Sequence, residues 1–303
     1  MVAAFLPAAV ACGPTGPGAT AGSGGQRVFV VTSTTVLADL IRQVGGERVE
    51  VRALVPSGAD PNTFQPAPRD VVVVSRAAIA FLNGLGLDRT IRTVLNNAAR
   101  PDLPTVVLSD GLPTIESGLT QLDRGTGGPG ASARGNPYLW LDPRYAGAYV
   151  ERIRDGLAMV DPAGGPLYQS NAAAYLQRIG ALDAEVEAAL AAIPAQQRKL
   201  VTLHDAFPYL AERYGFQLVG VVIKTPGREP SAQEVAEVSR AMQQQGVRTV
   251  FTEPQLDARL LKLAARDAGL NISTLYSDTL DQTVPSYEAL LRYNARQLVN
   301  GLK

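Results

Sequence analysis

Short apolar, β-branched runs alternate with longer amphipathic stretches along the chain from Arg27 onward. The short runs are typical of buried strands, and apolar residues three and four apart are typical of helices. Strands are predicted over 28–31, 49–55, 78–82, 105–108, 200–203, 218–223, 249–252 and 273–276. Helices are predicted over 36–44, 69–76, 88–98, 143–160, 167–193, 206–214, 231–245, 258–268 and 286–300. This succession predicts an α/β fold with mostly parallel sheets covered on both faces by helices.

One predicted helix, Leu167–Ile193, is far longer than the others and ends at Pro194. A helix of this length inside an α/β chain often connects two lobes. We therefore expect an N-terminal lobe over 27–165, a connecting helix over 166–194 and a C-terminal lobe over 195–303.

His204 is the only histidine of the chain and directly follows the predicted strand 200–203. That position places it at the carboxyl end of a strand, next to the start of a helix. In open α/β sheets ligands bind along this edge. An alternative is that His204 and Asp205 only cap the following helix, because Asp is a good N-cap residue.

Further chemically versatile side chains stand at predicted strand ends or at strand-to-loop junctions. Two come from the first lobe and three from the second. They are Asn62, Tyr138, His204, Glu253 and Asp278. Such side chains converging from two lobes predict a ligand-binding cleft between the lobes.

The N-terminal 26 residues have a different composition. Met1–Ala11 is apolar and rich in small residues, Cys12 follows, and Gly13–Gln26 is uncharged and rich in Gly, Pro, Thr and Ser. This order resembles a bacterial lipoprotein export signal in which Cys12 would carry the lipid, although the first residues lack the usual positive charge. The alternative is an ordinary disordered terminus. No later run is long enough to span a bilayer.

A second Gly-rich segment, Pro113–Pro137, is predicted to be a surface loop. Gly125, Gly127 and Gly130 match the spacing G-x-G-x-x-G. A dinucleotide-binding loop needs a strand before it and a helix after it, and the prolines here exclude that arrangement.

Charge and cysteine content narrow the possible functions. The 28 basic and 28 acidic residues cancel and no long basic run occurs, which argues against nucleic acid as a partner. Cys12 is the single cysteine, so the chain has neither an internal disulfide nor a thiolate metal cluster.

A hydrolase built on His204 would need a nucleophile beside it, and the chain has neither a G-x-S-x-G elbow nor a second cysteine. We therefore expect no catalytic activity.

Several sequence blocks resemble, in order, the substrate-binding proteins of zinc- and manganese-type metal ABC transporters, some of which are described as adhesin-like lipoproteins. The resemblance covers Arg27 to Lys303. The blocks are GGERVEVRALVPSGADPNTFQP from Gly45, NGLGLD from Asn83, YLWLDP from Tyr138, VTLHDAFPYLAERYGF from Val201, EPSAQEVAE from Glu229, VFTEPQ from Val250 and LYSDTL from Leu275. The resemblance implies two β/α lobes joined by one long rigid helix, with a metal ion held between the lobes.

The family's metal site takes one ligand from each of four blocks. Carried onto this chain, the positions are Asn62, Tyr138, His204 and Asp278. His204 and Asp278 match the pattern of the zinc-type members, whereas Asn62 and Tyr138 stand where the family has histidine. The chain's single histidine therefore rules out a three-histidine site.

This ligand set changes the expected cargo. Imidazole favours zinc, whereas phenol, carboxylate and amide oxygens are hard donors that favour manganese or iron. Glu253 would serve as a substitute carboxylate ligand or lie behind the ligands. We expect one transition metal ion as cargo, with manganese or iron favoured over zinc.

The expected function is that of an extracytoplasmic, lipid-anchored binding protein, monomeric, that delivers a metal ion to the membrane permease of an ABC transporter. The alternative keeps the fold but not the metal: a degenerate cleft that binds a non-metal ligand, or a surface adhesion or scaffold module. The departures at Asn62 and Tyr138 are what favour that alternative.

Overall fold

A computed structural model describes residues 1–2, 27–98, 100–116, 135–223, 231–267 and 269–303. The expected export signal with Cys12, and most of the Gly-rich segment 113–137, lie outside the described residues. No described helix is both long enough and apolar enough to cross a bilayer.

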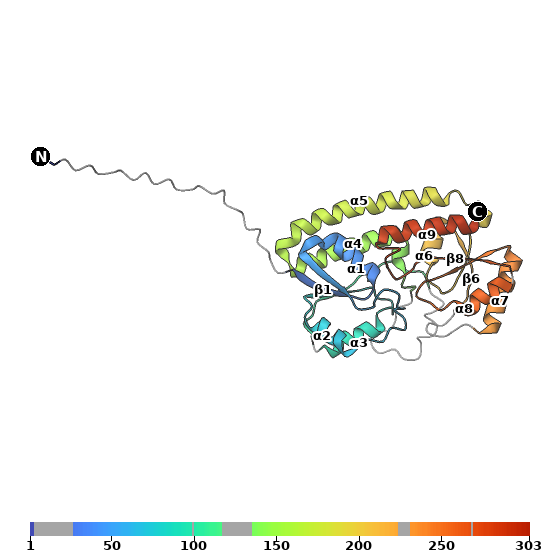
Figure 1. Cartoon of the computed structure of the whole chain (residues 1–303), viewed down its shortest axis with the longest axis horizontal. Coiled ribbons are helices and arrows are strands. Elements are labelled where there is room, and N and C mark those ends of the chain that lie inside the picture. The colour runs from blue at the N-terminus through green and yellow to red at the C-terminus, as the bar shows by residue number, and fades with distance from the viewer. Residues whose placement is uncertain (3–26, 99, 117–134, 224–230, 268) are drawn as a thin grey trace.

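The first lobe is built on a four-stranded parallel sheet in the order β2-β1-β3-β4. Its strands are β1 (Val28–Thr32), β2 (Val49–Ala53), β3 (Ile79–Leu82) and β4 (Thr105–Val107). Its helices are α1 (Thr35–Gly45), α2 (Pro68–Ser75), α3 (Arg89–Asn97) and α4 (Pro143–Val160). The α2 and α3 helices cover one face of the sheet, and α1 and α4 cover the other (Figure 1).

The second lobe repeats this plan with the sheet order β6-β5-β7-β8, again parallel. Its strands are β5 (Lys199–Thr202), β6 (Gln217–Val221), β7 (Thr249–Thr252) and β8 (Asn271–Thr274). Its helices are α6 (Pro208–Tyr214), α7 (Ala232–Gln245), α8 (Arg259–Asp267) and α9 (Tyr287–Leu302). The predicted α/β fold with mostly parallel sheets is confirmed.

The long helix α5 (Gly165–Leu190) runs from one lobe to the other, with α9 beside it (Figure 1). Its buried residues recur every three or four positions, as the sequence pattern predicts. The largest hydrophobic cluster includes residues from α1, α4, α5 and α9, so both lobes share one core on this side. The two lobes are therefore packed together by apolar burial as well as joined by the chain.

Most element boundaries differ from the prediction by one or two residues, and two of these shifts concern segments next to the candidate site. The last strand lies at Asn271–Thr274 rather than 273–276. It does not extend to Tyr276, because the Asn294 side chain accepts from the Tyr276 N–H and donates to the Tyr276 carbonyl. Helix α6 begins at Pro208 rather than Ala206, and Pro is favoured at the first helical position because it has no N–H to satisfy. His204 and Asp205 therefore lie in the turn before the helix, and no side chain caps its start.

Candidate metal site

The candidate residues of the second lobe lie at the carboxyl ends of its strands. His204 follows β5, Glu253 follows β7 directly and Asp278 follows β8. Strands β5 and β7 are neighbours at the centre of the sheet, while their connections lead to opposite edges. In α/β sheets, ligands bind at the carboxyl ends of the strands where the strand order switches in this way, and we use cleft for this region between the two lobes.

Tyr138 and His204 bring the two lobes together in this cleft. The Tyr138 hydroxyl lies 2.9 Å from Nε2 of His204, and the two rings meet edge to face. Both side chains are buried, Tyr138 completely. Tyr138 also packs edge to face against Trp140. The rings therefore fix each other's orientation, and the hydroxyl faces the imidazole nitrogen.

The other imidazole nitrogen of His204, Nδ1, lies 2.5 Å from Oε1 of Glu253. The Glu253 side chain is fully buried, so this pair is shielded from water. A carboxylate on Nδ1 orients the ring and keeps Nε2 as the nitrogen that faces Tyr138. Glu253 is thus placed behind His204.

The Tyr138 backbone is held by two buried asparagines. Asn136 accepts from the Tyr138 N–H at 3.0 Å and donates to the Asp205 carbonyl at 2.7 Å. Asn83 donates to the Pro137 carbonyl at 2.9 Å. Asn136 therefore connects the backbone beside Tyr138 with the backbone beside His204, across the junction of the lobes.

Asp278 is buried, and neither of its carboxylate oxygens has a hydrogen-bond partner among the described residues. Its charge acts on both His204 and Tyr138, so all three groups share one region of the cleft. Buried polar atoms in folded proteins are nearly always paired, and an unpaired carboxyl is costly. The two oxygens of Asp278 therefore have no polar partner among the described residues, which is the condition expected of a side chain that binds a ligand.

The segment around Asp278 is held by the first lobe. Trp140 Nε1 donates to the Ser277 carbonyl at 2.7 Å, and the Gly58 N–H donates to Thr279 Oγ1 at 2.9 Å. Ser57 Oγ donates to the Leu280 carbonyl at 2.7 Å. The backbone around Asp278 is therefore held in position, while its carboxylate oxygens have no hydrogen-bond partner among the described residues.

Asn62 lies beside Tyr138, with its amide nitrogen 3.0 Å from the Tyr138 hydroxyl. The same nitrogen donates to Asp60 Oδ1 at 2.9 Å. The structure thus brings Asn62, Tyr138 and His204 together through hydrogen bonds. The expectation that Asn62 offers its amide oxygen to a metal stays a prediction.

Burial and charge shift the proton affinities of the cleft groups. Burial would lower the pKa of His204, but the adjacent Glu253 carboxylate outweighs it and raises that pKa to about 9. Burial raises the pKa of Asp278 well above its ordinary range, although the His204 charge opposes this. Burial also raises the pKa of Tyr138. A metal ion entering the cleft would therefore have to displace protons.

No group of three or more His, Cys, Asp or Glu side chains in the described parts of the chain is placed to share one metal ion. A metal in this cleft would accordingly use donors beyond those residue types. Nε2 of His204 and the Tyr138 oxygen lie 2.9 Å apart, and the charge of the Asp278 carboxylate acts on both groups. This nitrogen and oxygen set suits manganese and iron better than a site rich in histidine would.

Two residues of this arrangement were not identified from the sequence, Asp60 and Asn136. Asp60 precedes Pro61-Asn62 in a turn, and its side chain organises that turn by accepting from Asn62 and Thr63. Asp at such a position was the available signal, because Asp commonly binds backbone N–H groups in turns. Asn136 lies in the Gly- and Pro-rich segment, and nothing in its sequence context marks it.

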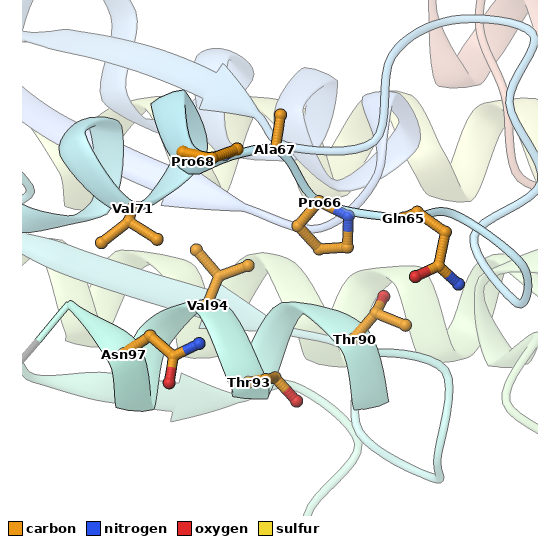
Figure 2. Close-up of a pocket in the computed structure, with 9 residues that line it drawn as sticks. All are labelled: Gln65, Pro66, Ala67, Pro68, Val71, Thr90, Thr93, Val94 and Asn97. Carbon is orange, nitrogen blue, oxygen red and sulfur yellow. The ribbon is translucent and has the colours of Figure 1, made fainter.

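A separate groove lies between α2 and α3 of the first lobe (Figure 2). It has a volume of about 460 Å³. None of the five candidate residues lines it; its walls come from α2, α3 and residues 65–68. It is therefore distinct from the cleft between the lobes.

Comparison with known proteins identifies the family. The profile of the family described as zinc-uptake complex component A, periplasmic (ZnuA), matches residues 30–301. The chain belongs to this family. The resemblance identified from the sequence blocks is thereby confirmed.

Curated members of the family extend over nearly the whole chain. The manganese-binding lipoprotein MntA of Halalkalibacterium halodurans is 30% identical, over 100% of this chain and 96% of that protein. The iron-binding protein YfeA of Yersinia pestis is 31% identical, over 91% of this chain and 86% of that protein. The relatives thus carry names that refer to different metals.

Solved structures confirm the ZnuA-type fold. A crystal structure of ZnuA superposes with a TM-score of 0.80 at 24% identity, covering 92% of this chain and 100% of the other. A cadmium-bound periplasmic metal-binding protein of Candidatus Liberibacter asiaticus gives a TM-score of 0.78 at 23% identity, covering 91% of this chain and 100% of that one. The two-lobed architecture with a long helix is therefore that of this family.

Proposed function

We propose that the chain is the extracytoplasmic substrate-binding component of a metal-ion ABC transporter and binds a transition metal ion in the cleft between its lobes. The observation that carries the proposal is the buried Asp278 carboxyl, which has no hydrogen-bond partner among the described residues. Its charge raises the pKa of both His204 and Tyr138. Family membership and the metal names of curated relatives support it.

The ion would take Nε2 of His204, a carboxylate oxygen of Asp278 and the Tyr138 oxygen, with Asn62 at the fourth family position. Glu253 would support His204 from behind, because it already binds Nδ1 of the same ring. The hard oxygen donors favour manganese or iron over zinc. The cargo would pass to a membrane permease.

We also propose the surrounding organisation: lobes 27–165 and 195–303, a connecting helix 166–194, a lipid on Cys12 and a monomeric state. Lipoprotein names among curated relatives support the anchor. We propose no catalytic role, since the sequence has no G-x-S-x-G elbow and no cysteine besides Cys12.

Metal content and thermal stability test the function together. The purified chain is analysed for bound elements, stripped, and melted with manganese, iron, zinc or calcium. An ion present at a hundred times its dissociation constant should stabilise the fold by about 2.7 kcal/mol. We expect manganese or iron to do so, and zinc to do so less.

Variants then assign the effect to the cleft. Asp278→Asn and His204→Ala should abolish the stabilisation by metal, and Glu253→Gln should weaken it less. Asp110→Asn, at an exposed carboxylate that is not among the candidate ligands, is the matched control and should change nothing. If no ion raises the melting temperature of the wild-type chain, metal binding is wrong and the alternative of a degenerate cleft gains support.

A further inference from the structure

The orientation of the Asn62 side chain is fixed by Asp60. Oδ1 of Asp60 accepts from the backbone N–H of Asn62 and from its side-chain Nδ2, both at 2.9 Å. The other oxygen of Asp60 accepts from Thr63 Oγ1 at 3.2 Å. Asp60 therefore holds the whole turn as well as the amide group.

A carboxylate oxygen only accepts hydrogen bonds, so the amide atom that faces Asp60 must be the NH₂ group. Rotating the amide by half a turn would place its oxygen against the carboxylate oxygen and lose this hydrogen bond. The second N–H of the same nitrogen then points to the Tyr138 oxygen, 3.0 Å away. The amide oxygen of Asn62 faces neither group.

This orientation conflicts with metal coordination by Asn62. An ion bound to the Tyr138 oxygen would meet the amide N–H that points to this oxygen, and this N–H carries partial positive charge. A neutral amide coordinates metal ions through its oxygen, and here the oxygen is turned away. Donation to the Tyr138 oxygen, in contrast, stabilises the negatively charged phenolate, and the phenolate is the form that would bind the ion.

We propose that Asn62 is a positioning residue that donates a hydrogen bond to the Tyr138 oxygen, with Asp60 fixing its direction, and is not a metal ligand. The inference rests on the proposed metal-binding function. The protein donors are then His204, Tyr138 and Asp278, and water completes the coordination of the ion. Such a site takes a hard divalent or ferric ion that tolerates water ligands.

Two substitutions at Asn62 separate the possible roles. Asn62→Asp replaces the donating NH₂ by an accepting oxygen, and Asn62→Leu removes both hydrogen bonds at similar volume. As a positioning residue, Asn62 should give weaker manganese binding in both variants, by about 10–100-fold, which is the usual effect of losing a partner behind a ligand. The Asp variant should be the weaker of the two. If Asn62 were a ligand, the carboxylate of Asn62→Asp should tighten binding.

The measurement is a manganese titration of each stripped protein, followed by the electron paramagnetic resonance signal of the free ion. Asn97→Asp, at an exposed position in the same lobe, is the matched control and should bind like the wild type. The ferric form gives a second readout, because a tyrosine ligand produces a visible charge-transfer band. That band should persist and shift in Asn62→Leu, and disappear in Tyr138→Phe.

Unfolding free energies of the metal-free variants show whether weaker manganese binding comes only from poor folding. In stripped protein, the unfolding free energies of Asn62→Leu, Tyr138→Phe and the double variant should be non-additive, because the two side chains share a hydrogen bond. Additive losses would overturn the proposal, and so would tighter manganese binding or unchanged binding in Asn62→Asp. Wild-type protein that binds no ion would overturn the proposed function and this inference with it. Tight wild-type binding with an unexpected Asn62→Asp result would overturn the inference alone.

Discussion

Two buried aspartates near the junction of the lobes have opposite surroundings. Asp39, in α1, is 8% exposed and accepts from the Tyr287 N–H at 2.8 Å and from Gln43 at 3.5 Å. Asp278, in the cleft, is 3% exposed and has no such partner among the described residues. Burial raises the pKa of both carboxyls.

Under the proposed function, Asp39 is a carboxyl that stabilises the fold and Asp278 is a carboxyl that binds the ion. Asp39 satisfies the backbone at the start of α9 and so joins two helices of the shared core. The oxygens of Asp278 have no hydrogen-bond partner among the described residues, although the neighbouring residues Ser277 and Thr279 are held by Trp140 and Gly58. A site that binds cargo gives up some stability in this way, and binding restores it.

The largest effect is expected in the pH dependence of the unfolding free energy of the metal-free protein. The pKa of His204 is raised from 6.5 to about 9 by Glu253, against the effect of burial. Its contribution to stability is therefore fully present below pH 6.5 and is lost as the pH rises through 9. The pKa of Asp278 is also raised in the folded state, so Asp278 too lowers the unfolding free energy as the pH rises. We expect stripped protein to lose a few kcal/mol between pH 6.5 and 9.

Denaturant unfolding at several pH values measures this loss. His204→Gln should flatten the curve over this window, and saturating manganese should flatten it too, because an ion on Nε2 replaces the proton. The affinity for manganese should rise over the same window. Stability that increases from pH 6.5 to 9 in the stripped wild type would contradict the predicted charge state of the cleft.

The sequence predicts where the candidate site residues stand along the chain better than it predicts the hydrogen bonds between them. His204 and Asp278 are found because each follows a strand, and strand ends of parallel sheets meet at one edge. The amide direction of Asn62 depends on Tyr138, 76 residues away in the chain, and on a turn closed by Asp60. The same holds for the shifted last strand, where the side chain of Asn294 decides the pairing of Tyr276. The spacing of apolar residues shows which face of a helix or strand is buried, but it does not show which atoms form hydrogen bonds.

A smaller effect is expected when the two aspartates are replaced in the same way. Asp39→Ala leaves the buried Tyr287 N–H without its partner, which should cost about 1–3 kcal/mol in unfolding free energy. Asp278→Ala removes an unpaired carboxyl, so stripped protein should gain about 1 kcal/mol while losing metal binding. Denaturant unfolding of the metal-free variants gives both values. Two losses of equal size would show that Asp278 is a structural residue like Asp39.

The smallest effect is expected at the exposed ion pair that joins α5 and α9. Arg292 binds Glu185 with two nitrogens, the shortest contact being 2.8 Å, and the two side chains are 41% and 52% exposed. Water screens such pairs, so Arg292→Ala should lower the unfolding free energy by only about 0.2–1 kcal/mol and leave manganese binding unchanged. Glu185→Ala should behave alike, and the double variant should show a coupling in the same range. A loss well above about 1 kcal/mol would mean that surface charge, together with the shared core and Asp39, holds the helical side of the junction.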